Sequence, residues 1–529
     1  MAPTDVLNLT IREAAAQIER SALSPVELTD AMLQRITHVD KTLNAYITVC
    51  GEQAREVALA AEKMIRAGYH LGPLHGIPIA IKDNIYTRGV RTTAGSKILA
   101  DFVPQEDATV TARLKRAGAV IIGKTNLHEF AWGGTTDNPH YGTCRNPWNP
   151  ERFPAGSSGG SGAAVAARTC LGALGTDTGG SIRLPSSVNG IVGIRPTIGR
   201  VSNHNVVPLA WTMDTVSPMT RTVEDCVLMF EIIAGHDPLD DHSAQAPVAD
   251  YRGELGRGLR GLRVGLIRDY SLSHVQPAVG QTIRAALTAL ESLGVEIEEI
   301  AMPSIHGNIS AQLTIESCEP STYHQEWLRT RAADYGDDVR TLLELGEMYL
   351  ATHYLQAQRY RSVLRKEFLD GFKRVDVFVT PTLPFTATPC GATTARDRRQ
   401  PPGGHALGHH AVHRRSQSGR PAGPVGPGRL RRRWAPGRHA GDRPAIRRGH
   451  AVPARSRLPA RHRLAHAGSQ IVTGLRRPGS RGRCPRPSRA RGRSRGRCVP
   501  SPSRRFAERG RRRIRCSARP ARWRALVRG

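Results

Sequence analysis

The chain has 529 residues, 39% of them hydrophobic, and a formal net charge of +31. A charge of that size is typical of proteins that bind nucleic acid or an anionic membrane. Residues 391–529, however, hold 39 Arg, no Lys and 3 acidic residues, a balance of +36, so residues 1–390 carry −5. The basic character belongs to the tail, and the mildly acidic body gives no electrostatic indication of a nucleic-acid partner.

Three further features bear on the compartment. The chain has no run of about 18 apolar residues, so we expect no membrane span. Its first residues lack a basic segment followed by an apolar core, so we expect no signal peptide. The nine cysteines are scattered singly and lack the spacing of zinc ligands. These features predict a cytoplasmic protein with unpaired thiols.

The first clear element is a helix that begins near Ser24. Ser can cap the unpaired N–H groups, Pro25 suits the first turn and Glu27 is placed to complete a capping box. The periodic run at residues 28–39 continues the helix.

Further along the chain, short β-rich apolar stretches alternate with amphipathic helical ones. The strand-like stretches are residues 76–83, 120–125, 262–269 and 295–300, and the helical ones are residues 109–119 and 282–294. This alternation predicts an α/β fold whose sheet is covered by helices on both faces. Residues 375–384 are expected to form one more buried strand, which ends at prolines.

The composition changes completely after about residue 390. Residues 391–529 are rich in Arg, Pro and Gly and cannot bury enough surface to order themselves. They form either a disordered basic arm that binds nucleic acid or an out-of-frame translation of GC-rich DNA. We favour the second hypothesis, because residues 434–448, back-translated and read one base later, can spell GLPVGMQVIGRPFDE, and the stretch from Gln417 can become NLAGRPALSVPGGF. Sequencing the gene tests it.

The stretch GTDTGGSIRLPSS at residues 175–187 places Ser181 directly after two glycines. A serine hydroxyl is a poor nucleophile unless a base lies within hydrogen-bond reach and donors stabilise the oxyanion. The glycine-rich turn could supply those donors from its backbone. The base must come from elsewhere, because Arg183 breaks the G-x-S-x-G pattern and no Ser-x-x-Lys occurs.

Two other stretches offer partners for this serine. Lys82 ends an apolar strand-like run, where partial desolvation would lower its pKa toward that of a usable base. Ser157 and Ser158 lie in the glycine-rich loop of residues 153–162, directly before a helix of small residues. Taken alone, each feature is more often structural, a snorkelling lysine or a flexible turn.

Weaker candidates are His75, His128, His140, His204 and Asp214. Nothing in the sequence pairs the histidines with a carboxylate, so we expect them to be structural or to lie at the edge of a pocket. Asp214 is expected either to face the substrate pocket or to cap a loop.

Lys82, GSSGG at residues 156–160 and GTDTGGSIR at residues 175–183 together resemble the amidase signature family. Lys82 precedes Ser157 by 75 residues, and Ser157 precedes Ser181 by 24 residues. The blocks GKTNLHEF, RNPWNPERFPAGSSGGSGAAVAA, VGIRPTIGRVS and TVSPMTRTVEDC are similar to other parts of the family's pattern. The resemblance covers roughly residues 5–390 and implies the family's fold, a central mixed β-sheet between helices.

The resemblance implies a Ser–cis-Ser–Lys triad. Ser181 would attack the amide carbonyl, and Ser157, preceded by a cis peptide bond from Gly156, would relay the proton. Neutral Lys82 would be the base. Ser158 is the alternative relay residue.

The resemblance also implies roles for the rest of the turn. The oxyanion hole would be formed by the backbone N–H groups of Thr178, Gly179, Gly180 and Ser181. Asp177 and Arg183 would hold the loop in shape. No metal or organic cofactor would be needed.

The implied activity is hydrolysis of the C–N bond of a small-molecule carboxylic amide through an acyl-enzyme. The close alternative is the glutaminase-type A subunit of a glutamyl-tRNA(Gln) or aspartyl-tRNA(Asn) amidotransferase, with B and C subunits as partners. PLAWTMDTVSP differs from the block expected there, so we favour a stand-alone amidase, for which a homodimer is an open alternative. An inactive truncated product and a nucleic-acid binder acting through the basic tail are the alternatives of another class.

The sequence departs from the family pattern in two places. Ala155 stands where glycine is common, a tolerable change if this residue has a negative φ. The tail replaces the family's C-terminal part, which in relatives completes the core sheet and one wall of the pocket, so residues 1–390 would be an incomplete amidase signature domain. A chain made as written would then expose apolar surface, and we expect misfolding or aggregation.

Overall fold

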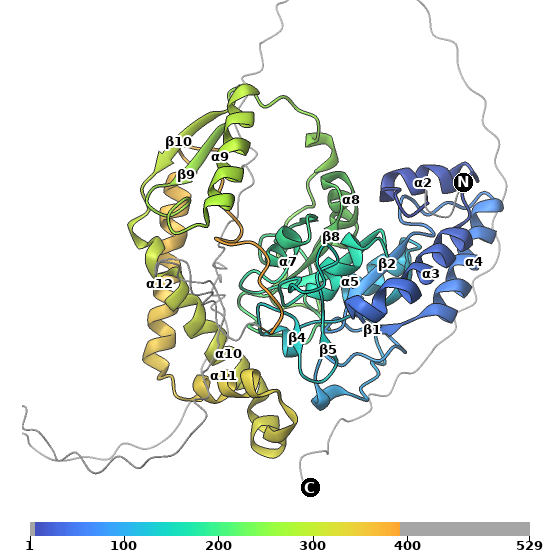
Figure 1. The fold of residues 1–529 in the computed structure, drawn as a ribbon, viewed down its shortest axis with the longest axis horizontal. Helices are drawn as coiled ribbons and strands as arrows, with labels where there is room; N and C mark the ends of the chain where they lie inside the picture. Colours follow the sequence, from blue (N-terminus) through green and yellow to red (C-terminus); the bar gives the residue numbers. More distant parts are fainter. Residues whose placement is uncertain (1–5, 392–529) are drawn as a thin grey trace, which may run out of the picture. The chain divides into compact units, whose positions relative to one another are not determined.

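The structure is a computed structural model that describes residues 6–391. Six strands form a central sheet in the order β1-β3-β2-β6-β8-β7 (Figure 1). The strands β3, β2 and β6 are parallel, whereas β1, β8 and β7 run antiparallel to their neighbours. Their bounds are Tyr46–Val49 for β1, Pro78–Lys82 for β2, Val120–Thr125 for β3, Gly172–Asp177 for β6, Val192–Gly193 for β7 and Thr215–Thr220 for β8. The expected central mixed sheet is confirmed.

Helices lie on both faces of this sheet. The helices of this region are α2 Ile11–Glu19, α3 Pro25–Leu43, α4 Gly51–Arg66, α5 Thr109–Arg116, α6 Gly159–Ala166, α7 Arg183–Val188 and α8 Val223–Ile233. Successive residues of β6 face opposite sides. A Cβ added to Gly172 would meet Met229 of α8, whereas one added to Gly175 would meet Ser158 at the start of α6. The predicted layering of helices around a sheet is therefore confirmed.

The sequence around Ser24 explains where α3 begins. Its Oγ accepts hydrogen bonds from the N–H groups of Val26 and Glu27, as an N-cap should. The hydrogen bonds described for this helix include none from the N–H of Ser24 to the carboxylate of Glu27, so the second half of the expected capping box is missing. A reciprocal capping box forms instead at Thr10 and Glu13, where α2 begins.

Helix α6 is built almost entirely of small residues, GGSGAAVA. Ala163 and Ala164 are fully buried, and the helix packs against β2, β3, β6 and β8. Small side chains allow a helix backbone to lie close to a sheet. This packing places the loop before α6, which carries Ser157, next to the end of β2.

A second sheet of three parallel strands follows in the chain, in the order β10-β9-β11. Its elements are β9 Arg263–Ile267, α9 Pro277–Ser292, β10 Glu296–Ile300 and β11 Val377–Phe378. The strands and helix predicted between residues 262 and 300 are thus confirmed. The buried strand expected at residues 375–384 is wrong in extent, since only the two half-buried residues of β11 pair with β9. The prolines that follow have no N–H with which to continue the pairing.

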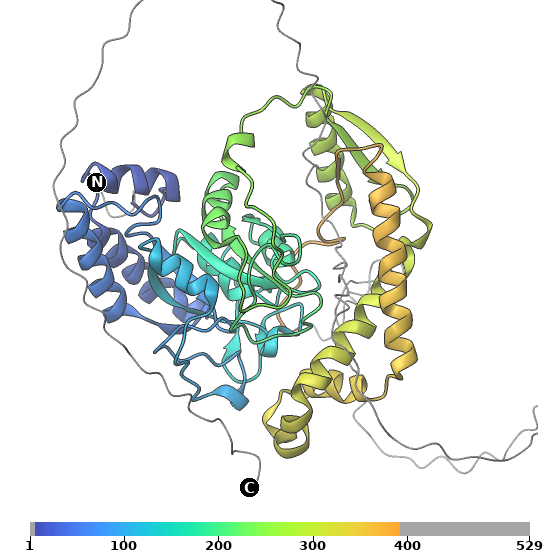
Figure 2. The same cartoon turned by 180° about the vertical axis from the view of Figure 1, so that it is seen from behind.

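The first of three further helices packs against the other two, and the last of the three also shares a buried cluster with the second sheet (Figure 2). They are α10 Asn308–Arg331, α11 Asp337–Glu347 and α12 Ala351–Gly371. Ala311 and Ile315 of α10 share a buried cluster with Ala210 and Met213 of the loop before β8. This apolar contact fixes α10 against the part of the chain that leads into the central sheet.

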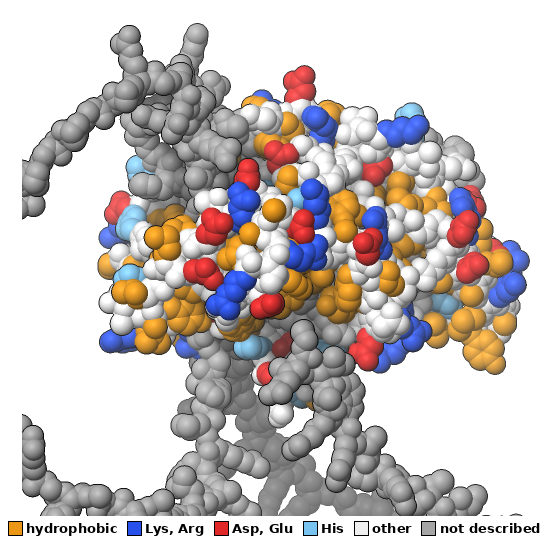
Figure 3. Space-filling view, turned by 90° about the horizontal axis from the view of Figure 1, so that it is seen from below, with side chains coloured by type: hydrophobic (Ala, Val, Ile, Leu, Met, Phe, Trp, Pro, Cys, Tyr) orange, Lys and Arg blue, Asp and Glu red, His pale blue; other side chains and the backbone are white. Residues whose placement is uncertain are grey.

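The described part of the chain contains the short hairpin of β4 Asp137–Asn138 and β5 Gly142–Thr143, and the 3-10 segments Lys97–Leu99, Glu129–Ala131, Arg252–Glu254, Pro303–Gly307 and Ala332–Asp334. On the face of the molecule drawn in Figure 3, acidic and basic side chains are interspersed among apolar ones. None of the helices between residues 6 and 391 is both long and apolar enough to cross a membrane. Apart from Gly391, the Arg-rich tail and its alternative reading frame lie outside the described residues.

Candidate active site

Lys82 is the last residue of β2, a strand in which every residue is buried. Its Nζ lies 2.8 Å from Oγ of Ser157 and 2.7 Å from Oγ1 of Thr176. Burial lowers the pKa of Lys82 to about 7, although the carboxylates of Asp177 and Asp214 act in the opposite direction. The amine can therefore be neutral near neutral pH while it contacts a serine hydroxyl.

The glycine-rich loop before α6 presents its two serines differently. The Gly156–Ser157 peptide bond is cis, as the resemblance implied. Ser157 contacts Lys82, whereas the Ser158 hydroxyl donates to the carbonyl of Thr176 at 3.1 Å and accepts from its N–H at 3.3 Å. Of the two serines, only Ser157 is hydrogen-bonded to the lysine.

The turn after β6 carries Ser181, which is buried. Gly180 has a φ of 143°, a conformation that residues with a side chain rarely adopt, so the turn requires glycine there. The N–H groups of residues 178–181 donate no hydrogen bond to another described residue. The N–H of Ser158 donates to the carbonyl of Ser181 at 3.2 Å and joins the two loops. The hydroxyls of Ser157 and Ser181 are not joined by a hydrogen bond described for this part of the chain.

Asp177 braces the start of this turn. Its carboxylate accepts from the N–H groups of Ile182 and Arg183 at 3.2 and 3.3 Å, and it pairs with the guanidinium groups of Arg183 and Arg195 at 2.9 Å each. Burial alone would raise the pKa of Asp177, but the two positive charges outweigh it and hold that pKa well below its usual range. Arg195 was not predicted, although it lies in one of the blocks that resemble the family.

Asp214 caps the loop before β8. Its Oδ1 accepts from Oγ1 of Thr178 at 2.5 Å and from the N–H of Ala210 at 3.1 Å, and its Oδ2 accepts from the N–H of Leu209 at 2.9 Å. Burial raises the pKa of Asp214 to about 6. Of the two roles expected for Asp214, these contacts match the loop cap, and through Thr178 they reach the turn that carries Ser181.

Thr176 and Asn84 also belong to this group and were not predicted. Thr176 Oγ1 accepts from Lys82 and, at 3.3 Å, from Nδ2 of Asn84. Thr176 thereby gives the amine a second partner besides Ser157. The only signal in the sequence for Thr176 is a hydroxyl residue directly after the apolar residues of β6 and before Asp177.

The expectation that no histidine pairs with a carboxylate is wrong for two of the four. Nε2 of His128 lies 2.8 Å from Oδ2 of Asp338, and Nε2 of His140 lies 2.9 Å from Oε1 of Glu129. Asp338 follows His128 by 210 residues, so the pairing depends on tertiary contacts that no local pattern records. Among the hydrogen bonds of residues 6–391, neither pair contacts the Ser181 hydroxyl.

The condition under which alanine would replace glycine easily at Ala155, a negative φ, is not met. Its φ is 60°, in the left-handed region, which costs a residue with a Cβ about 1–2 kcal/mol. The carbonyl of Ala155 accepts a hydrogen bond from Oγ1 of Thr136 at 2.9 Å. The surrounding fold therefore holds the loop in the shape that glycine would adopt more easily.

A second buried lysine, Lys124, lies on the neighbouring strand and has a structural role. Its Nζ lies 3.3 Å from Oδ1 of Asp83 and donates to the carbonyl of Ile85 and to Oγ1 of Thr92 at 2.8 and 2.6 Å. Both charged side chains are fully buried.

We expect Lys124→Met to lower the free energy of unfolding by about 3–5 kcal/mol, because it leaves Asp83 as an unpaired buried charge. Urea denaturation measures this change. The same substitution at the exposed Lys97 should change the free energy by no more than about 0.5 kcal/mol. Equal losses in the two variants would contradict the role assigned to the buried pair.

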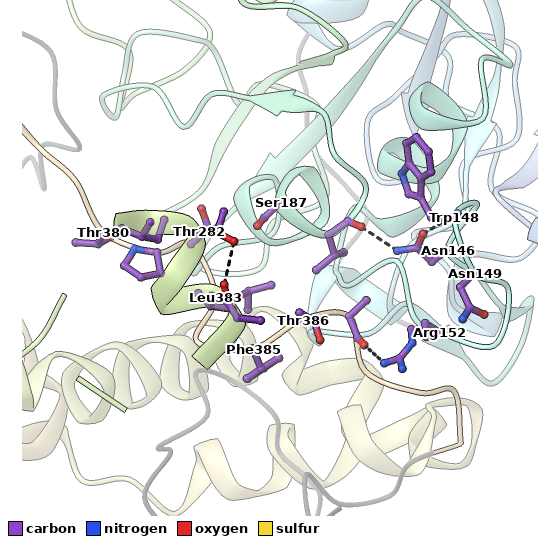
Figure 4. Close-up of a pocket in the computed structure, with 17 residues that line it drawn as sticks. Asn146, Trp148, Asn149, Arg152, Ser187, Thr282, Thr380, Leu383, Phe385 and Thr386 are labelled. Carbon is purple, nitrogen blue, oxygen red and sulfur yellow. Dashed lines mark hydrogen bonds between the residues drawn. The ribbon is translucent and has the colours of Figure 1, made fainter. Parts of the chain in front are cut away.

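A cavity of about 510 Å³ lies apart from these residues (Figure 4). Residues 146–152, α7, α9 and residues 380–387 contribute to its lining. Lys82, Ser157 and Ser181 are not among the lining residues, so the cavity is separate from the cluster around the lysine.

A buried amine that contacts one serine, beside a turn that carries a second serine and unengaged N–H donors, is suited to activating a hydroxyl for attack on a carbonyl. With the mixed sheet around it, this site defines an enzyme that cleaves amide bonds. The sequence profile of the Amidase family matches residues 27–401, and the chain belongs to that family.

Known relatives agree with this assignment. The A subunit of glutamyl-tRNA(Gln) amidotransferase from Roseiflexus sp. strain RS-1 is 43% identical over 407 residues, which are 73% of this chain and 83% of the relative. The crystal structure of the corresponding protein from Thermotoga maritima is 34% identical, with a TM-score of 0.63 over 73% of this chain and 82% of that one. A structure described as a vestigial protein complex that reveals the origins of an s-triazine catabolic enzyme is 33% identical, with a TM-score of 0.71 over 76% and 87% of the two chains.

Proposed function

We propose that the chain hydrolyses carboxylic amides with Ser181 as the nucleophile, Ser157 as the proton relay and Lys82 as the base. Neutral Lys82 accepts the proton of the Ser157 hydroxyl, which in turn accepts the proton of Ser181 as its Oγ bonds to the amide carbon. The same path returns a proton to the departing nitrogen as the C–N bond breaks. Water then attacks the acyl-enzyme and releases the acid.

The single observation that carries this proposal is the 2.8 Å contact between Lys82 Nζ and Ser157 Oγ at a fully buried position. The available N–H groups of Thr178, Gly179, Gly180 and Ser181 support the assignment of the oxyanion hole to this turn. In the proposal, Asp177 and Arg183 keep the turn in shape, because both loop N–H groups and the guanidinium bind the same carboxylate. Ser158 ties the two loops together and is not the relay.

The second candidate is the ammonia-releasing A subunit of a tRNA-dependent amidotransferase. Relatives with that name are 40–43% identical to this chain, which weighs against our preference for a stand-alone amidase based on PLAWTMDTVSP. In that role the substrate would be glutamine, and B and C subunits would be the partners. The basic-tail binder and the inactive product both depend on residues outside the described part of the chain.

Ammonia release with and without partner subunits separates the two candidates. For the A subunit, we expect glutamine hydrolysis to rise at least about tenfold when B and C subunits are added, a coupling of ordinary size between protein sites. For the stand-alone enzyme, the isolated chain should hydrolyse simple amides at a rate that these subunits do not change. Ser181→Ala is the blank in both assays.

A further inference from the structure

Two polar side chains of α10 cover the turn that carries Ser181. Gln312 and Glu316 are four residues apart, so both lie on one face of the helix. A Cβ added to Gly179 would overlap Nε2 of Gln312 and Oε1 of Glu316. The two side chains therefore rest directly on the backbone that is proposed to stabilise the oxyanion.

Glu316 is unusual among the buried carboxylates of this region, because its hydrogen bonding is incomplete. It is 6% exposed, and among the described residues its one donor is Nε2 of Gln312, at 3.2 and 3.3 Å from its two oxygens. A carboxylate can accept about four hydrogen bonds. Glu319, one turn further along α10, accepts from Thr212 N–H, Thr212 Oγ1 and Tyr354.

No lysine or arginine of residues 6–391 forms an ion pair with Glu316. The nearby guanidinium groups of Arg183 and Arg195 are paired with Asp177 instead. Burial raises the pKa of Glu316 to about 7, although the hydrogen bond from Gln312 and the positive charge of Arg195 act in the opposite direction. A negative charge on Glu316 beside a developing oxyanion would oppose catalysis, unless a donor on the substrate lies between them.

We propose that Gln312 and Glu316 bind a cationic N–H donor of the substrate, such as an ammonium group, and so select amides that carry a positive charge near the scissile carbonyl. This inference rests on the proposed function, since it takes Ser181 as the reacting group. Glu316 provides the negative charge and unfilled acceptor sites, and Gln312 orients the carboxylate. The substrate then supplies the direct ion-pair partner that Glu316 lacks among residues 6–391.

Two fluorophosphonates of equal length, one with a terminal ammonium and one with a methyl group, test the proposal on the full chain at about pH 8.5, where the carboxylate is mostly ionised. We expect the wild type to be labelled at Ser181 at least about tenfold faster by the ammonium probe. Glu316→Gln should reduce this ratio to about one while the methyl probe still labels. Glu326→Gln, which removes an exposed charge from the same helix, should leave the ratio unchanged.

Equal labelling of the wild type by the two probes would overturn the inference and leave Ser181 as the nucleophile. An unchanged ratio in a folded Glu316→Gln variant would overturn it too. Failure of both probes to label Ser181 in folded protein would instead refute the proposed function. The ratio of the labelling rates of the two probes on the wild type tests the inference even if Glu316→Gln does not fold.

Discussion

Ser181→Ala is expected to abolish amide hydrolysis, with kcat/KM reduced by about 10⁴-fold or more, the loss seen when a catalytic nucleophile is removed. The alanine lacks the oxygen that would bond to the carbonyl carbon, while the backbone N–H donors of the turn remain. The residual rate should come from these donors and from binding alone. Steady-state hydrolysis and labelling by a fluorophosphonate measure the effect.

Ser187→Ala is the matched control for this variant, because Ser187 is an exposed serine of α7 only six residues further along. It should keep wild-type hydrolysis and wild-type labelling. Peptide mapping should place the label on Ser181. A label on another serine, or full hydrolysis by a folded Ser181→Ala variant, would remove the basis of the proposed mechanism.

Lys82→Met is expected to lower kcat/KM by about 10²–10⁴-fold and to remove its dependence on pH near neutrality. The neutral amine is the form that can accept a proton from Ser157. Because burial lowers the pKa of Lys82 to about 7, wild-type kcat/KM should rise about tenfold per pH unit below that value and reach a plateau above it. Lys82→Arg should be similarly inactive, since a guanidinium does not lose its proton in a protein.

Lys97→Met removes a positive charge from an exposed position and is the control for the Lys82 variants. It should retain both the wild-type kcat/KM and the wild-type pH profile. Circular dichroism and urea unfolding show whether each Lys82 variant is folded. A folded Lys82→Met enzyme with the wild-type pH profile would mean that another group accepts the proton.

Local sequence is enough to predict β2, β3 and the two glycine-rich turns of the site, whereas the grouping of Lys82, Ser157 and Ser181 was predicted from the resemblance to a family. The apolar run of β2 ends at Lys82, and the glycines around Ser157 and Ser181 mark two tight turns. These features are local, because burial and backbone freedom depend on neighbouring residues. The bounds of β2, β3 and β9 were accordingly predicted to within about two residues. The strand predicted to end at Pro384 is longer than the observed β11, because the length of a strand depends on pairing with a distant partner.

Which serine meets the lysine, by contrast, depends on tertiary contacts, since Ser157 and Ser158 are adjacent and face different neighbours. Tertiary packing also pairs His128 with Asp338 and places Glu316 over Gly179, contacts between residues more than 100 positions apart. Such contacts depend on how helices and loops pack and on the rotamers that the packing allows, and a local pattern of residues contains no information about either. For the same reason the left-handed backbone of Ala155 could not be predicted from the sequence. Contacts with the rest of the fold hold Ala155 at a positive φ, although alanine favours a negative φ.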